Sequence, residues 1–184
     1  GRVVAVGILS IPSGDYFPAV MRFNADGTRD ATFGSDGLAV WAGFPAMTEA
    51  RAVAVLPDGR ILAAGAATGA TLDIDDFAVV RFDAFGVPDT TFGSAGIATV
   101  PVSAAGTTEM ATAMTVLPDG RILLAGQSFG ASGADFALAR LHEDGATDTT
   151  FGMAGRIVVP AGGAFEGAGL AQWGDGSFVI AGSG

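Results

Sequence analysis

The residues best suited to chemistry in this sequence are three arginine–aspartate pairs with constant spacing. The aspartate follows the arginine by eight residues in every pair: Arg22 and Asp30, Arg81 and Asp89, Arg140 and Asp148. A guanidinium group can anchor an anionic ligand, or it can hold a carboxylate through two parallel hydrogen bonds. Because the pair recurs three times, we interpret it as a bidentate structural contact between two strands.

A second candidate is the segment Asn24-Ala-Asp-Gly-Thr-Arg-Asp30, which has the pattern of a short calcium loop. Oxygen ligands at alternate positions followed by a glycine suit a hard cation. The related segments 83–89 and 142–148 weaken this interpretation, because Phe85 cannot be a ligand and the loops lack the bidentate glutamate of the full calcium motif. We expect Asp-Gly turns here, and calcium is the one cofactor that the sequence leaves open.

Two further features are weaker candidates. The most acidic local stretch is Leu72-Asp-Ile-Asp-Asp76, which suits a cation or a basic partner but is more typical of a solvated loop. His142 is the only histidine and there is no cysteine, so an ordinary zinc site is excluded. A Ser-His-Asp triad would have to use His142, and we expect no Gly-Xaa-Ser-Xaa-Gly elbow to serve it. We interpret His142 as a turn residue.

The aromatic residues divide into repeated and unrepeated ones. Phe33, Phe92 and Phe151 recur at one place in the pattern, which is typical of core packing or packing between repeats. Trp41 and Trp173 have no counterparts, and they are slightly better candidates for ligand stacking, although we expect each to lie in the core.

All of these residues lie in an internal repeat. The segment Asp-Xaa-Thr-Phe-Gly occurs at 30–34, 89–93 and 148–152, so that equivalent residues are 59 apart in both steps. A fixed period of this size indicates a repeat architecture.

Each repeat contains four short strand candidates, which we name A to D. The B strands are expected at 1–9, 59–65, 120–126 and 176–182. The C strands are expected at 17–23, 77–82 and 136–141, and the D strands at 38–42, 97–100 and 156–159. The A strands are expected at 50–56, 111–117 and, more weakly, 168–173. The B strands are continuously apolar, which predicts strands covered on both faces.

This pattern predicts an all-β protein with β-propeller blades of four antiparallel strands, in three repeats of about 59 residues plus a partial fourth. We expect one repeat domain over 1–184, with units of approximately 1–58, 59–119 and 120–175 and a partial unit at 176–184. Three blades are fewer than the usual four to eight. The chain is therefore expected to be a segment of a longer propeller, or else two copies join as six blades, which would leave the extra B strand unexplained.

Composition excludes several classes of function. The net charge is −10, and all nine basic residues are arginines without an evident cluster, which argues against nucleic acid and against anionic lipid. No apolar run approaches the length of about 18 residues that a membrane span needs. The B–C loops at 66–76 and 127–135 differ in length and composition, and binding is expected in such variable loops.

Three motifs in constant order closely resemble the bacterial delta-60 repeat, which is classed as a propeller domain of unknown function. They are Leu117-Pro-Asp-Gly-Arg-Ile-Leu-Leu-Ala-Gly126, Asp135-Phe-Ala-Leu-Ala-Arg140 and Asp144-Gly-Ala-Thr-Asp-Thr-Thr-Phe-Gly152. The resemblance covers essentially the whole chain, and it departs from the repeat at Phe85 and at the last A strand. It implies a propeller in large secreted or surface-attached bacterial proteins, without enzyme activity and without catalytic residues to transfer.

We therefore expect a non-enzymatic binding or structural module, secreted or on the cell surface, whose ligand is a protein or a carbohydrate. No catalytic, cofactor-binding or metal-binding residue is assigned. One alternative is a subunit that assembles into rings or fibres through open blade edges. The other is a hydrolase or lyase, which would need paired carboxylates with raised pKa.

Overall fold

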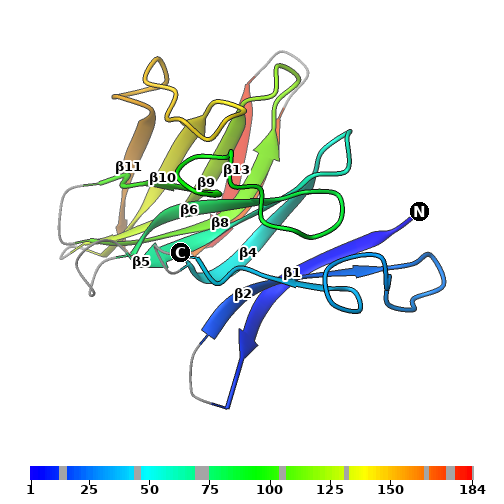
Figure 1. The fold of residues 1–184 in the computed structure, drawn as a ribbon. Helices are drawn as coiled ribbons and strands as arrows, with labels where there is room; N and C mark the ends of the chain where they lie inside the picture. The colour runs from blue at the N-terminus through cyan, green and yellow to red at the C-terminus, as the bar shows by residue number, and fades with distance from the viewer. Residues whose placement is uncertain are drawn as a thin grey trace.

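The computed structural model describes residues 1–12, 16–43, 47–68, 75–103, 107–130, 133–163, 166–172 and 177–183. Within these ranges the chain forms thirteen β-strands and no helix, so none of the described residues lies in a helix able to cross a membrane. The strands form separate antiparallel sheets that follow one another along the chain like the leaves of a fan (Figure 1).

The first sheet has three strands, β1 (Val3–Ser10), β2 (Tyr16–Phe23) and β3 (Leu38–Val40). The second sheet has four, β4 (Met47–Val55), β5 (Ile61–Thr68), β6 (Asp75–Phe82) and β7 (Ile97–Val100). The third also has four, β8 (Thr108–Val116), β9 (Ile122–Gly130), β10 (Gly133–Leu141) and β11 (Arg156–Gly163). The last is the hairpin of β12 (Glu166–Gln172) and β13 (Phe178–Ser183).

The all-β blade architecture predicted from the repeat is confirmed. The strands occur in the predicted order, with β4, β8 and β12 as A strands and β1, β5, β9 and β13 as B strands. Each complete sheet starts at its A strand, whereas the sequence units were counted from their B strands. The A strand pairs with the B strand that follows it, as β4 does with β5. Each four-stranded sheet therefore combines the A strand of one sequence unit with the B, C and D strands of the next.

The hydrophobic core lies between neighbouring sheets. Along β5, Ile61 and Ala63 belong to the cluster between the first and second sheets, whereas Leu62 and Ala64 belong to the cluster between the second and third. Since both faces of such a strand are covered, residues 61–67 of β5 are all apolar or glycine.

The expectation of two covered faces is correct for β5 and β9 but wrong for β1 and β13. Side chains of β5 are buried from Ile61 to Ala67, whereas those of β1 alternate between exposed and partly buried. In β13, Val179 is 45% exposed. These two strands belong to the sheets at the ends of the fan, where a neighbouring sheet covers at most one face.

The glycine that ends the core of β5 and of β9 has a local cause. Pairing between the A and B strands shifts register between Ala50 and Ala52, and again between Ala111 and Ala113. At this irregularity the backbone of Glu49 lies against Gly65, where any Cβ atom would collide with its carbonyl oxygen. The bulge in the A strand therefore requires glycine in the B strand.

Candidate functional site

The best-defined polar site is the arginine cluster at the end of each C strand, as seen at Arg81 in the second sheet. Its Nε donates to Asp89 Oδ2 at 2.8 Å, and its Nη2 donates to Thr91 Oγ1 at 3.3 Å. The guanidinium carbon lies 4.7 Å from the centre of the Phe92 ring. Charge, hydrogen bonds and a cation–π contact thus hold one buried side chain.

The aspartate of the cluster divides its two oxygens between partners. Asp89 Oδ1 accepts from the Thr91 backbone N–H at 3.1 Å and from the Thr91 hydroxyl at 2.6 Å. The expected bidentate contact with the arginine is therefore wrong, because threonine occupies the second carboxylate oxygen. The Thr91 hydroxyl lowers the pKa of Asp89 most, burial opposes it, and the Thr91 N–H and Arg81 lower it further.

The same cluster occurs in the first and third sheets. Arg22 Nε donates to Asp30 at 2.8 Å and Arg140 Nε donates to Asp148 at 2.7 Å, and each guanidinium lies 4.5 Å from the centre of its phenylalanine ring. Hydrogen bonds from Thr32 and Thr150 are the largest cause of the lowered pKa of Asp30 and Asp148. These carboxyl groups therefore stay ionised well below neutral pH.

Tight backbone geometry places the cluster. Asp89 N–H donates to the Arg81 carbonyl and Phe92 N–H donates to the Asp89 carbonyl, which folds the motif back on the strand end. Gly93 has a φ of 55°, and a Cβ atom there would collide with the Ile97 carbonyl. Glycine therefore follows the phenylalanine in every repeat.

The clusters of the first and second sheets also donate hydrogen bonds to the next sheet. Arg22 Nη1 donates to the Ala84 carbonyl at 2.5 Å, and Gly34 N–H donates to the Phe85 carbonyl at 2.7 Å. The matching bonds one repeat later run from Arg81 to the Glu143 carbonyl at 2.9 Å and from Gly93 to the Asp144 carbonyl at 2.7 Å. The cluster thus joins consecutive blades.

This contact shows how Phe85 can stand where an aspartate was expected in the turn. Only the backbone carbonyl of that residue is used by Gly34, and the Phe85 side chain is exposed. The glycine that follows, Gly86, lies against the ring of Phe33, with the site of a Cβ atom 3.0 Å from a ring carbon. The first sheet therefore contacts this turn through the turn's backbone and its glycine.

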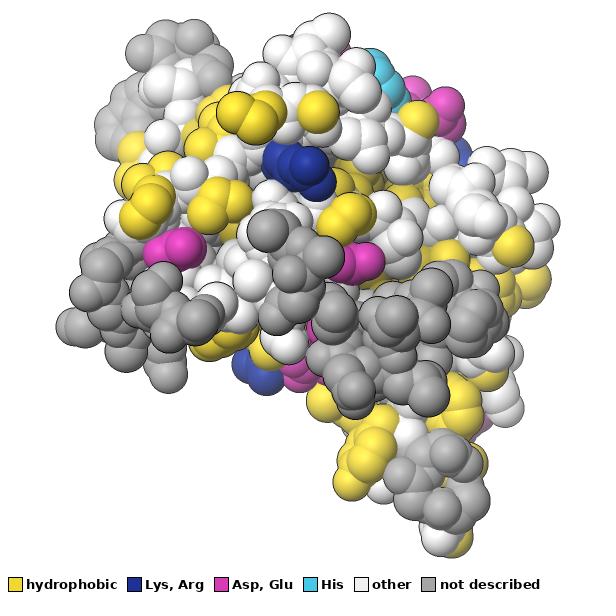
Figure 2. Space-filling model, turned by 90° about the vertical axis from the view of Figure 1, so that its left-hand side faces the viewer, with side chains coloured by type: hydrophobic (Ala, Val, Ile, Leu, Met, Phe, Trp, Pro, Cys, Tyr) yellow, Lys and Arg dark blue, Asp and Glu magenta, His cyan; other side chains and the backbone are white. Residues whose placement is uncertain are grey.

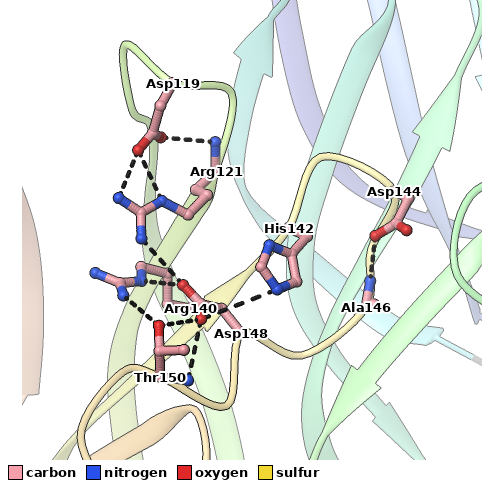
Figure 3. Close-up of polar contacts among 8 residues, drawn as sticks. All are labelled: Asp119, Arg121, Arg140, His142, Asp144, Ala146, Asp148 and Thr150. Carbon is pink, nitrogen blue, oxygen red and sulfur yellow. Dashed lines mark hydrogen bonds and ion pairs between the residues drawn. The ribbon is translucent and has the colours of Figure 1, made fainter.

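Arginines at the start of the B strands complete the network. Arg60 pairs with Glu143 of the next sheet, at 3.2 Å between Nη2 and Oε1. Arg121 instead approaches Asp148 of its own sheet at 3.2 Å, beside Arg140 and Thr150 (Figure 3). Asp148 therefore receives hydrogen bonds from two arginines.

His142 lies in a turn, as the sequence predicted. Its N–H donates to the Ala146 carbonyl and its own carbonyl accepts from Gly145. Its ring is 52% exposed, and Nε2 lies 3.9 Å from Asp148 Oδ1, as Figure 3 shows. The carboxylate oxygens of Asp148 accept hydrogen bonds from Thr150 and Arg140. The contact with His142 therefore does not resemble a catalytic pair.

The oxygens of the calcium-like segment bond within the turn. Asp26 Oδ1 accepts from the backbone N–H of Thr28 at 3.0 Å and from its hydroxyl at 2.6 Å. Asn24 Nδ2 donates to the Arg29 carbonyl at 3.2 Å, and Asp30 belongs to the Arg22 cluster. Within the described residues, no group of three or more acidic or histidine side chains is arranged to hold a metal ion.

The expectation that the chain lacks a nucleophile-elbow spacing is wrong, because Gly126-Gln-Ser-Phe-Gly130 has it. The segment lies in strand β9, whereas an elbow needs a sharp turn between strand and helix. Ser128 is buried, and its hydroxyl donates to Ser103 Oγ at 2.7 Å. Ser103 in turn contacts the buried Glu109, so this serine belongs to a structural network.

Buried Glu109 joins the loop before β8 to the sheet. Its carboxylate accepts from the backbone N–H groups of Val102 at 2.6 Å and Ser103 at 2.7 Å. Burial, Glu109 and Asp75 together raise the pKa of Asp76, with burial the largest cause. Residues 72–74 of the acidic stretch lie outside the described residues.

The two tryptophans have different outcomes. Trp41 is buried at the end of β3 and its ring lies against Gly96 of the second sheet, which confirms the core interpretation. Trp173 lies outside the described residues.

An open apolar groove of about 560 Å³ lies between the A–B turns of the second and third sheets. Val55, Leu56, Val116 and Leu117 are among the residues that line it.

Comparison with known proteins agrees with this geometry. A family model described as domain of unknown function (DUF5122) beta-propeller matches residues 1–33, 56–92 and 117–151, more than half of the chain. Each matched segment ends at the phenylalanine of the arginine cluster. No curated protein matches the chain. The predicted propeller repeat family is thus confirmed, while the delta-60 name and the bacterial origin stay predictions. The chain belongs to the DUF5122 β-propeller family of unknown function.

Proposed function

We propose that this chain is a non-enzymatic binding or structural module of a bacterial protein that is secreted or held at the cell surface. The observation that carries the proposal is the use of the recurring charged cluster: Arg22 and Arg81 both donate to backbone carbonyls of the next sheet. The most conspicuous polar groups therefore hold the blades together, and ligand recognition falls to other surfaces.

The ionisation of the carboxyl groups supports a role without catalysis. A general acid needs a raised pKa, whereas hydrogen bonds lower the pKa of Asp30, Asp89 and Asp148. Asp76 has a raised pKa, which makes it the residue around which a hydrolase or lyase would have to be built. The module as proposed needs no cofactor, and calcium is tested below.

The proposed ligand is a protein or a carbohydrate. The candidates to compare are residues 69–74, where the repeats differ in sequence, and the apolar groove beside Val55 and Val116, which are equivalent residues of two repeats. Nucleic acid is a poor partner because the net charge is −10.

The test is binding of the chain to arrays of bacterial polysaccharides and displayed peptides, with and without calcium. A variant with residues 69–74 replaced by glycine and serine, and Val116→Asp in the groove, locate any binding, and unchanged melting temperature controls for folding. Binding that one variant abolishes supports the proposal. Hydrolysis of chromogenic glycosides or esters that Asp76→Asn abolishes would instead show that the chain is an enzyme, and would overturn the proposal.

A second candidate is self-assembly through open edges of the fan. It is favoured by Phe151, which is partly exposed although Phe33 and Phe92 are fully buried, and by Met153, which is 80% exposed. Figure 2 shows hydrophobic side chains exposed across one side of the molecule. Light scattering over a range of concentrations tests it, since a constant monomer mass would exclude assembly.

A further inference from the structure

The apolar groove between the second and third sheets is the open end of the core that joins them. Its sides include Val55 of β4 and Val116 of β8, which are paired with the first residues of β5 and β9. Two of its lining residues, Leu62 of β5 and Ile122 of β9, are buried members of the core cluster between these sheets. An apolar group bound in the groove would therefore extend an existing hydrophobic core.

The size and exposure of the groove suit a ligand. Both sheets that form it are complete and four-stranded. Val55 is 56% exposed, and Pro57 and Pro118 are exposed at the two A–B turns. The volume of about 560 Å³ falls within the range of about 300–1,000 Å³ that is typical of ligand sites.

Three charged side chains are among the lining residues, and two of them are carboxylates. Arg60 Nε donates to Asp58 Oδ2 at 2.5 Å, and its Nη2 donates to Glu143 Oε1 at 3.2 Å. The backbone N–H of Arg60 is the largest cause of the lowered pKa of Asp58, so this carboxyl group is ionised at neutral pH. One arginine thus balances two carboxylates, and the lining keeps an excess of negative charge.

Glu143 is the carboxylate best placed to meet a ligand. Its side chain is 64% exposed, and Oε2 lies 3.3 Å from the Cβ position of Gly120 in the A–B turn of the third sheet. Among the described residues, only Oε1 of this carboxylate is bonded to a donor. Oε2 can therefore accept a charge-assisted hydrogen bond from a guanidinium or ammonium group at the groove.

We propose that the groove binds an extended peptide segment of a partner protein, in which an aliphatic side chain lies next to an arginine or a lysine. The aliphatic side chain packs between Val55 and Val116, and Glu143 binds the cation. The net charge of −10 attracts a basic segment and speeds its association. The inference rests on the proposed binding function, and it chooses a protein rather than a carbohydrate as the ligand of the groove.

The lining favours a peptide over a carbohydrate. A sugar ring carries hydroxyl groups around its edge, and each of them needs a hydrogen-bond partner when it is buried. The groove is lined mainly by valine, leucine, isoleucine and proline, and its arginine is already bonded to both carboxylates. An aliphatic side chain has no polar group to satisfy, so it can be buried there without this penalty.

The experiment selects a displayed library of random eight-residue peptides on the full chain and titrates the most enriched peptide by fluorescence anisotropy. We expect enrichment of peptides with a leucine, isoleucine or methionine beside a basic residue. Val55→Asp and Val87→Asp form a matched pair, because these valines are 56% and 57% exposed and only Val55 lines the groove. Val55→Asp is expected to weaken binding at least tenfold, and Val87→Asp less than twofold.

The role of Glu143 is tested by charge. Glu143→Gln and Asp36→Asn each remove one carboxylate from an exposed ion pair with an arginine, so they change the net charge equally. Only Glu143→Gln is expected to weaken binding of the selected peptide, by at least threefold. It is expected to have no effect on the same peptide with glutamine in place of its basic residue. This pair also keeps the test valid if Val55→Asp has a lowered melting temperature.

The other outcomes separate this site from the binding function on which it rests. The groove is excluded as a peptide site if no selected peptide binds below about 1 mM, or if Val55→Asp binds as tightly as the unmodified chain. Polysaccharide binding that Val55→Asp abolishes would make the groove a carbohydrate site, and self-association that it abolishes would make a second copy the occupant. Either result overturns the peptide but not the binding function, which fails only if the polysaccharide arrays also yield no ligand.

Discussion

The Nη1 atom of Arg81 lies 2.9 Å from the carbonyl oxygen of Glu143, a residue 62 positions later in the next sheet. The same guanidinium is bonded to Asp89 in its own sheet. One side chain therefore connects a turn, a strand end and the neighbouring blade. Arg81 belongs to the motif of one repeat, but in the structure it is bonded to two blades.

Arg81→Ala is expected to destabilise the chain more than Arg140→Ala. Both lose a carboxylate and a ring contact, but only Arg81 loses a bond to the next sheet. Removing one partner of a buried pair costs about 3 kcal/mol, and we expect about half of this for the more exposed Arg140. Urea unfolding measures the difference, and Arg29→Ala, an exposed pair, is expected to change it by less than about 0.5 kcal/mol. Equal losses at Arg81 and Arg140 would contradict the blade-joining role.

Gly86→Ala and Gly27→Ala form a matched pair. Both glycines have nearly the same positive φ, so both changes cost about 1 kcal/mol of backbone strain. Only at Gly86 does the added methyl group also meet Gly34 N and the Phe33 ring. We expect Gly86→Ala to be more destabilising by about 1–3 kcal/mol. Thermal unfolding at a dilution where the chain is monomeric measures this difference, and identical melting temperatures would show that the turn does not bear on the neighbouring blade.

Acid is expected to destabilise the chain through the three clustered aspartates. Their pKa values are lowered in the folded state, so the stabilisation is fully present above the unfolded value of about 3.9. It is lost as pH falls from that value toward the folded pKa. Urea midpoints between pH 6 and pH 2 measure the loss, and Asp148→Asn is expected to be less stable at pH 6 with a shallower pH dependence. A midpoint that stays constant to pH 2 would contradict this.

Asp76→Asn is expected to raise the melting temperature at pH 7. Burial and the nearby Glu109 and Asp75 raise the pKa of Asp76, so its ionised form is penalised in the folded state. The penalty disappears as pH falls through the raised pKa, and the gain from the substitution is therefore expected to shrink in acid. Melting curves at pH 7 and pH 4 measure it, with Asp36→Asn at an exposed position as the comparison. A gain that does not depend on pH would point to a cause other than charge.

The repeat in the sequence was sufficient to predict the strands and their order. The glycine-bounded apolar runs correspond to β5 and β9, and the recurrence of Phe92 predicted its burial. Local turn chemistry and hydrophobic patterning are properties of short segments, so they can be read from one chain. The arginine–aspartate pairing was also predictable, because both members lie within one repeat.

The partners outside each repeat were decided by the tertiary structure. Bonds such as Arg22 to the Ala84 carbonyl connect residues 62 apart and end on backbone atoms, which leave no mark on the side-chain pattern. The second oxygen of Asp89 accepts from Thr91 instead of from the arginine, which the spacing of arginine and aspartate does not reveal. The difference between the buried Phe92 and the partly exposed Phe151 is likewise invisible in their identical motifs. It arises because burial depends on the sheet that comes next, and the sequence of one blade does not contain its neighbour.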